Sequence, residues 1–270
     1  MLDVTDPADS TDHGFRDALL DVYLENPSRT LSTAFWKFGS RLDEFRTVVE
    51  TDDVRVTRLS AWNEDELQVH WTRDRDRFPF SPAFVAESNL AVVHDDYLRH
   101  LPERMVGTAE PFFRMERRSR PHSSPNLPSG YRFQDVDVER ETDELSELIS
   151  RCYDDLGPDS ETVAQWTEHP VFEEDLWVWI VERETGDYVG AGVAELDAGI
   201  REASLEWIQV LPRYHGEGLG RALVRELLRR VGGRVAFTTV SGRYDGDKGL
   251  KAFYERCGFQ GDDIWWVFRD

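Results

Sequence analysis

The stretch VLPRYHGEGLG, residues 210–220, decides the fold of this chain because it joins two runs of different character. The run before it, 202–210 (EASLEWIQV), reads as a strand, and the run after it, 221–231 (RALVRELLRRV), has the apolar spacing of a helix. Three glycines at alternating positions let the backbone approach a ligand closely. The helix places one apolar stripe on a sheet, formed by Leu219, Leu223, Leu227, Leu228 and Val231. Its N-terminus therefore faces outward at the loop, where unpaired N–H groups predict a site for phosphate or pyrophosphate.

Three classes of phosphate ligand compete for this loop. A nucleoside triphosphate loop needs Gly-Lys-Ser/Thr, but Gly220 is followed by Arg221 and Ala222. A dinucleotide site needs GxGxxG early in the chain and an acidic residue about 20 positions later, where this chain has Val240. Coenzyme A is the third class.

The elements around the loop predict an α/β fold, a mixed sheet with helices on its faces. We expect strands at 131–138, 176–182, 188–197, 202–210, 234–240 and 263–270, and helices at 142–157, 161–169, 221–231 and 246–257. Their order is β-α-α-β-β-β-α-β-α-β. We expect Ser160 to cap the second helix, and Gly232 and Gly233 to end the helix behind the loop.

Four features of this C-terminal half carry a family resemblance. They are the loop 213–218 (RYHGEG), the VLP before it, the later segment 252–259 (AFYERCGF) and the order of the elements. Together they resemble the GNAT superfamily of acyl-CoA-dependent N-acyltransferases, with its Q/R-x-x-G-x-G/A loop and its late lYeklGF signature. Two positions depart from the family pattern: His215 replaces the usual Arg or Lys, and Asp247 replaces a frequent Asn.

The resemblance implies acetyl-CoA as co-substrate and a central strand that splays from its neighbour near residues 207–211. The residues that it assigns to the cofactor are Ile208, Val210, Leu211, Arg213, His215, Gly216, Glu217, Gly218, Leu219, Gly220, Arg221 and Asp247. It also places Tyr254 as general acid for the departing thiolate. No metal enters this expectation.

A general base must take a proton from the substrate ammonium, and Glu206 is our candidate. Strand alternation puts it on the face of Ile208 and Val210, where apolar neighbours would raise the pKa of its carboxyl. Glu195 and Glu202 are weaker candidates.

Composition narrows the partners and the setting. The net charge of −21 is spread along the chain, with 53 acidic residues against 32 basic ones. This pattern resembles the proteins of salt-accumulating halophilic archaea, and it disfavours nucleic acid because no basic stripe meets the phosphates. The sequence contains no apolar run long enough for a membrane span and no secretory signal. Two cysteines without metal-binding spacing fit a reduced, cytoplasmic location.

A polar stretch rich in proline and serine, 119–130, divides the chain. We expect an acidic tail at 1–14, an N-terminal α+β domain at 15–118 and the GNAT-like domain at 131–270. The N-terminal domain lacks a glycine loop. It is either a degenerate second copy of the same fold or an unrelated cap, and it either shapes the acceptor site or makes a homodimer.

The sequence therefore predicts an N-acetyltransferase that moves an acetyl group to a primary amine, on a small molecule or a peptide, in a ternary complex. A non-catalytic acyl-CoA sensor is the alternative from another class. A nucleotide-dependent oxidoreductase is a third possibility, disfavoured by the missing acidic residue.

Overall fold

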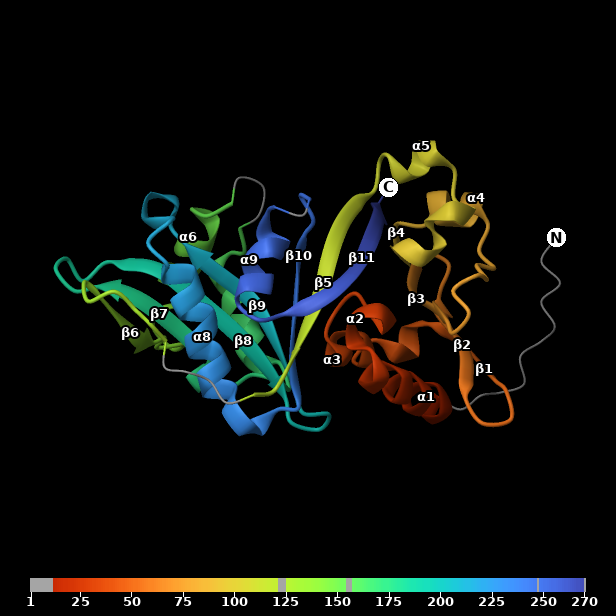
Figure 1. Ribbon diagram of the computed structural model, residues 1–270, viewed down its shortest axis with the longest axis horizontal. Helices are drawn as coiled ribbons and strands as arrows, with labels where there is room; N and C mark the ends of the chain where they lie inside the picture. The colour runs from red at the N-terminus through yellow and green to blue at the C-terminus, as the bar shows by residue number, and fades with distance from the viewer. Residues whose placement is uncertain (1–11, 121–124, 154–156, 247, 270) are drawn as a thin grey trace. The chain divides into compact units, whose positions relative to one another are not determined.

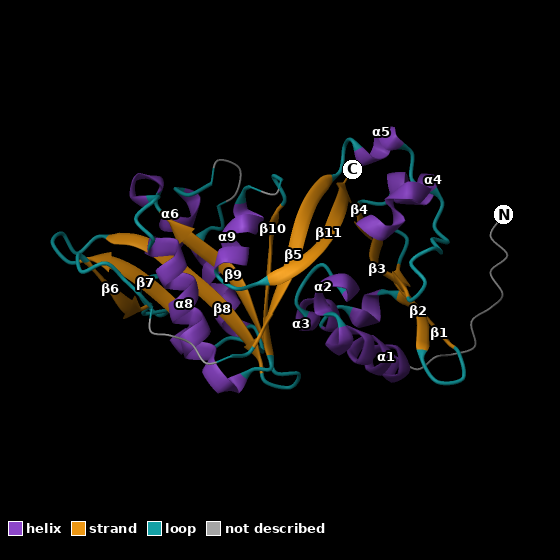
Figure 2. Cartoon of the chain, in the orientation of Figure 1, coloured by secondary structure: helices purple, strands orange, loops and turns teal. Residues whose placement is uncertain are grey.

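A computed structural model describes residues 12–120, 125–153, 157–246 and 248–269. The chain forms two compact units (Figures 1 and 2). The first unit takes residues 1–116 with 241–252 and 260–270, and the second takes 117–240 with 253–259. The first unit thus combines the N-terminal part of the chain with its last strand. The linear domain boundaries expected from the sequence remain a prediction, and most of the expected acidic tail lies outside the described residues.

The first unit contains a mixed sheet in the order β1-β2-β3-β4-β11-β5. Its strands are β1 (Arg46–Thr51), β2 (Val56–Trp62), β3 (Glu66–Thr72), β4 (Leu90–His94), β5 (Glu110–Arg118) and β11 (Gln260–Arg269). Its helices are α1 (Asp12–Glu25), α2 (Pro27–Thr30), α3 (Phe35–Gly39), α4 (Pro82–Glu87) and α5 (Glu103–Val106), with 3₁₀ turns at Leu42–Glu44 and Asp95–His100. Only β3 and β4 are parallel among these pairs; the others are antiparallel.

The second unit contains a sheet in the order β10-β9-β8-β7-β6. Its strands are β6 (Tyr131–Asp135), β7 (Trp177–Glu182), β8 (Tyr188–Asp197), β9 (Glu202–Val210) and β10 (Phe237–Arg243). Its helices are α6 (Thr142–Ser150), α7 (Ser160–Gln165), α8 (Leu219–Val231) and α9 (Leu250–Arg256), with 3₁₀ turns at Trp166–Glu168, Glu174–Leu176, Pro212–Tyr214 and Gly232–Arg234. The predicted order of elements is confirmed. β9 and β10 are parallel, as a crossover through a helix requires.

Helix α8 covers one face of this sheet (Figure 1). Its apolar stripe is buried, as predicted. A Cβ added at Gly192 of β8 would lie 2.9 Å from Leu223, so the glycine permits this close approach. The helix begins at Leu219, two residues earlier than predicted, and Gly232 ends it with φ +46°. The positive φ is why glycine suits that position.

Helices α6 and α7 contribute to a core on the opposite face. Its buried members are Val136, Leu145, Leu148, Ile149, Val163, Trp177, Trp179, Val181, Ala191, Val193 and Leu211. Helix α6 ends at Ser150, earlier than predicted, and residues 154–156 lie outside the described part. The predicted cap at Ser160 is wrong, since Asp159 accepts the Thr162 N–H at 2.8 Å. Aspartate caps well because its carboxylate also favours the positive end of the helix.

No helix within the described ranges combines the length and the apolar character needed to cross a bilayer.

Candidate active site in the second unit

A wedge opens in the sheet between β9 and β10. The two strands pair from Glu202 with Phe237 to Leu205 with Val240, and the pairing then stops. Both strands continue, β9 to Val210 and β10 to Arg243. The backbone of residues 206–210 therefore leaves its parallel neighbour, close to the predicted splay at 207–211. Backbone groups released in this way can pair with an extended ligand.

Glu206 lies where the wedge begins, in a β-bulge. On β8, Val193 pairs with Trp207 and the adjacent Ala194 pairs with Leu205, so Glu206 is the extra residue. The bulge shifts the alternation of side chains by one position. The prediction that Glu206 shares a face with Ile208 and Val210 is therefore wrong.

Contacts on both sides of β9 establish the corrected face. Ile208 and Val210 pair with Gly192 and Gly190, on the α8 side. Trp207 pairs with Val193 and packs with the core beneath α6 and α7. The Ser204 hydroxyl donates to Glu206 Oε1, and Ser204 pairs with Glu195 on that same face. The Glu206 carboxylate thus belongs to the α6 and α7 side.

The other two carboxylates considered as bases are more buried and are bound by neighbours. Glu195 is 8% exposed, and its Oε1 lies 3.3 Å from His169 Nδ1. Glu202 is 1% exposed and accepts the Thr239 hydroxyl at 2.6 Å, at the end of β9 away from the wedge. Glu206 is half-buried, so it is the most accessible of the three.

The glycine loop follows β9 directly and leads into α8. Gly216 and Gly218 have φ of +87° and +83°, a left-handed backbone that favours glycine. No atom of the described residues lies within 4 Å of a Cβ placed at either glycine. Gly218 is the N-cap residue of α8 and has no side chain to bond the first-turn N–H groups, so these groups can bond a ligand. This open cradle at a helix N-terminus fits a pyrophosphate.

The polar side chains of the loop contact neighbouring groups of the second unit. The Arg213 guanidinium lies 4.8 Å from the Tyr214 ring and 3.9 Å from the Asp187 carboxylate. His215 Nε2 bonds the Val210 carbonyl at 2.8 Å. Glu217 accepts the Tyr131 hydroxyl at 2.7 Å, which raises the pKa of Tyr131 to about 12. Pyrophosphate binding here would rest on backbone N–H groups.

The remaining predicted cofactor residues lie around the same strand end. Leu211 and Leu219 are buried, Ile208, Val210 and Gly220 are half-buried, and Arg221 is exposed. Gly220 approaches α9 closely, since a Cβ there would lie 3.5 Å from the Phe253 ring. Asp247 lies outside the described residues.

Tyr254 lies on α9, 5% exposed, between the rings of Phe253 and Phe259 at centroid distances of 5.0 and 5.6 Å. Burial raises the pKa of its hydroxyl well above the usual value, and the Tyr153, Cys257 and Glu206 groups add to this shift. The hydroxyl therefore stays protonated at neutral pH, as a proton donor must. Glu206 makes the last of these contributions, so its carboxylate lies near enough to Tyr254 to act on the charge of the hydroxyl.

Comparison with known families supports this geometry. Residues 174–261, which include β9, the glycine loop and Tyr254, match the model of the acetyltransferase (GNAT) domain. The GNAT resemblance is thereby confirmed for residues 174–261. No curated protein matches the chain by sequence.

Solved structures extend the GNAT fold over the whole chain. A GCN5-related N-acetyltransferase from Sphaerobacter thermophilus has a TM-score of 0.67 at 14% identity, covering 95% of this chain and 90% of its own. A Drosophila protein has a TM-score of 0.62 at 17% identity, covering 96% and 97%. A tandem GNAT protein from the clavulanic acid biosynthesis pathway has a TM-score of 0.55 at 14% identity, covering 96% of each chain. Of the two folds left open for the N-terminal region, a second GNAT-like copy and an unrelated cap, these structures support the second copy.

The N-terminal copy has a wedge of its own, but its own side chains fill it. β3 and β4 pair only from Glu66 with Leu90 to Leu67 with Ala91. Further along β3, the Thr72 N–H donates to the Tyr97 hydroxyl, and the Thr72 carbonyl accepts from Arg29, both at 2.8 Å. The connection after β3, residues 73–81, contains no glycine. Among the described residues, an open wedge that leads into a glycine loop therefore belongs to the second unit.

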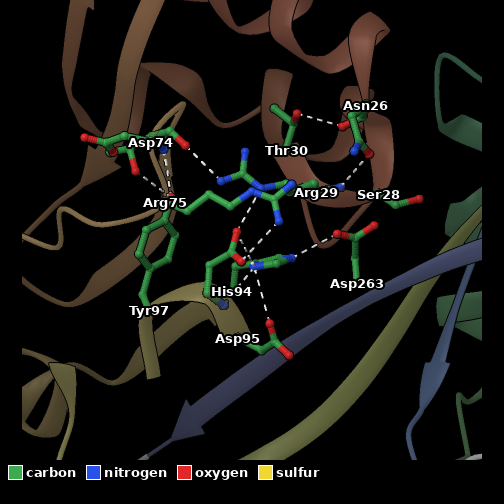
Figure 3. A network of polar contacts seen from close by, with 12 residues as sticks. Asn26, Ser28, Arg29, Thr30, Asp74, Arg75, His94, Asp95, Tyr97 and Asp263 are labelled. Atoms are coloured by element: carbon green, nitrogen blue, oxygen red, sulfur yellow. Dashed lines mark hydrogen bonds and ion pairs between the residues drawn. The ribbon is translucent and has the colours of Figure 1, made fainter. Parts of the chain in front are cut away.

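A polar network surrounds this filled wedge (Figure 3). His94 bonds the Asp263 carboxylate of β11 at 3.1 Å through Nε2 and the Asp96 N–H at 3.1 Å through Nδ1. Asp96 also accepts from Arg29 at 2.8 Å. His94, Asp95 and Asp96 are a group close enough to hold a metal ion, but both ring nitrogens of His94 already bond protein atoms.

Sequence reasoning missed Gln209, which lies beside a group of aromatic residues. Gln209 is 3% exposed on β9, and Trp207 contacts the rings of Trp166 and Tyr153. A glutamine within an apolar strand was the available signal, because a buried amide needs partners for several hydrogen bonds.

Proposed function

We propose that the chain transfers an acetyl group from acetyl-CoA to a primary amine, by direct attack while both substrates are bound. One observation carries the proposal. The wedge that opens at Glu206 leads along the same strand to the glycine cradle, so a reacting end and a phosphate end lie on one ligand path. Acetyl-CoA would supply the activated acyl group as its thioester.

Residues of the second unit have separate roles in the proposed reaction. N–H groups of residues 216–221 bind the pyrophosphate, and the backbone of Ile208 and Val210, on the edge of β9 that leaves β10, holds the extended arm and polarises the thioester carbonyl. Glu206 takes a proton from the substrate ammonium, directly or through water. The amine nitrogen then bonds the acetyl carbon as the carbon–sulfur bond breaks. Tyr254 protonates the leaving thiolate, and the second amine proton restores its hydroxyl through solvent.

Ligand binding tests the first half of the proposal. Thermal unfolding is followed in molar KCl, chosen for the net charge of −21, with acetyl-CoA, CoA, NAD or ATP. A ligand at about 100 times its dissociation constant adds about 2.7 kcal/mol to the free energy of unfolding. A shift with the CoA compounds alone supports the proposal, whereas a shift with NAD alone would favour the oxidoreductase.

Turnover tests the second half. Thiol release from acetyl-CoA is measured with a panel of primary amines, and mass spectrometry detects the N-acetylated product. Cofactor binding without product from any amine would favour the acyl-CoA sensor instead.

A further inference from the structure

Gln209 has a buried amide that the proposed reaction leaves unused. Its side chain is 3% exposed, and its Oε1 has no hydrogen-bond partner among the described residues. Its Nε2 donates to the Tyr153 hydroxyl at 3.4 Å, a long bond. Buried polar atoms in native proteins are nearly always paired, so an unpaired carbonyl beside a substrate path indicates a ligand that donates a hydrogen bond.

The carbonyl lies on the face of β9 that carries Trp207 and Glu206. Gln209 pairs with Ala191, a member of the core beneath α6 and α7, so it shares the face of Trp207 and Glu206. Trp207 stacks on Trp166 with ring centroids 5.2 Å apart at 15°. The Tyr153 ring meets Trp207 edge-on at 6.2 Å, and Tyr153 remains 41% exposed. A ligand that reaches Gln209 would therefore lie against aromatic side chains.

The carboxylates on this face favour a cationic ligand. Glu206 opens the wedge, and Glu195 pairs in register with Ser204, whose hydroxyl bonds Glu206. His169, the basic group bonded to Glu195, is partly exposed. Carboxylates and aromatic faces both attract ammonium groups, more strongly where water is partly excluded. An anionic acceptor would be repelled here.

We propose that the acetyl acceptor is an aliphatic diamine or polyamine, which presents one ammonium to Glu206 and a second N–H donor to Gln209 Oε1. This inference rests on the proposed function. Three residues along a strand span about 10 Å, less the shortening at the bulge. A chain of several methylene groups bridges that distance, and its apolar part would lie on Trp207.

Steady-state kinetics with matched amines tests the inference. Each α,ω-diamine is compared with the n-alkylamine of the same length, using wild type, Gln209→Leu, Gln209→Glu and, as control, Gln260→Leu at an exposed position of β11. We expect wild type to favour the diamine by roughly tenfold or more in kcat/KM, as for one hydrogen bond to a charged group. Gln209→Leu should lose this preference with the KM for acetyl-CoA unchanged. Gln209→Glu, which keeps an acceptor oxygen, should retain it, and the control should match wild type.

Two kinetic outcomes would overturn the inference. One is equal use of diamine and alkylamine by wild type. The other is a raised KM for acetyl-CoA in Gln209→Leu with the diamine preference intact, because the carbonyl would then serve the cofactor arm.

A binding measurement separates this inference from the proposed function. Titration calorimetry with CoA present compares 1,4-diaminobutane with n-butylamine on wild type and Gln209→Leu. Tighter diamine binding that the variant loses supports the site even if no amine is acetylated, in which case only the proposed turnover fails. Equal binding of the two amines overturns the site, whether or not turnover is found.

Discussion

Tyr254→Phe is the sharpest test of the chemistry because the change removes one hydroxyl and leaves the ring. The ring contacts with Phe253 and Phe259 persist, so the free energy of unfolding should fall by no more than about 1 kcal/mol, the contribution of one hydrogen bond. The effect on rate should be much larger. Burial keeps the hydroxyl protonated, so the proton that the proposed acid must donate is in place at neutral pH. Loss of general acid catalysis costs about 10²- to 10⁴-fold, which corresponds to about 2.7 to 5.4 kcal/mol in the activation barrier.

The assay is thiol release under saturating acetyl-CoA and amine, with the KM for acetyl-CoA measured separately. Tyr23→Phe is the matched control, because Tyr23 is fully buried in the first unit and its hydroxyl accepts from Arg114 at 2.9 Å. We expect kcat to fall at least 100-fold in Tyr254→Phe alone, with cofactor affinity kept. A kcat within threefold of wild type, or an equal fall in the control, would refute the assignment of Tyr254.

Three further predictions concern the base, the loop and the N-terminal unit. Glu206→Gln should lower kcat/KM by about 10²-fold or more and abolish its rise with pH, with little change in the unfolding midpoint; an unaltered pH profile would exclude Glu206 as base. Gly218→Ala should raise the KM for acetyl-CoA in kinetics and destabilise the fold by about 1 kcal/mol in calorimetry, because φ is +83° there. Gly233→Ala is the control, since Gly233 has open space and no positive φ, and it should change neither quantity. Burial lowers the pKa of His94, but the Asp263 carboxylate bonded to Nε2 and the Asp96 carboxylate 3.3 Å from Nδ1 outweigh burial and raise it above the usual 6.5. His94 therefore stabilises the fold fully below about pH 6.5, and this contribution is lost as pH rises through the folded-state pKa; denaturant titrations of His94→Gln should show a flatter stability profile across that range, and a profile parallel to wild type would contradict the linkage.

Local signals in the sequence were enough for most of the second unit. The strands 188–197 and 202–210 were predicted with the bounds that the structure gives, because turn residues separate two apolar runs. The stripe of α8 and the glycine at its end follow from helical spacing and backbone sterics. These features depend on residues a few positions apart, which a single sequence displays.

Features set by distant partners were not predictable. The bulge at Glu206 depends on the register between β9 and β8, and the residues near Glu206 contain no signal for an extra residue. The face of the proposed base was therefore predicted wrongly. The polar filling of the first wedge joins Arg29, Thr72 and Tyr97, which helical or strand periodicity cannot bring together. The lack of a hydrogen-bond partner for Gln209 Oε1 among the described residues likewise depends on distant residues, which the sequence alone does not place.

The last strand carries a consequence for synthesis on the ribosome. β11 lies between β4 and β5 in the sheet of the first unit, bonded to both. Until residues 260–269 leave the exit tunnel, the nascent first unit lacks its inner strand, and β4 and β5 each present an open edge. The second unit, from β6 to β10, can meanwhile form its own sheet. The region made first is therefore finished last, and a chain truncated before Gln260 should aggregate through its N-terminal half.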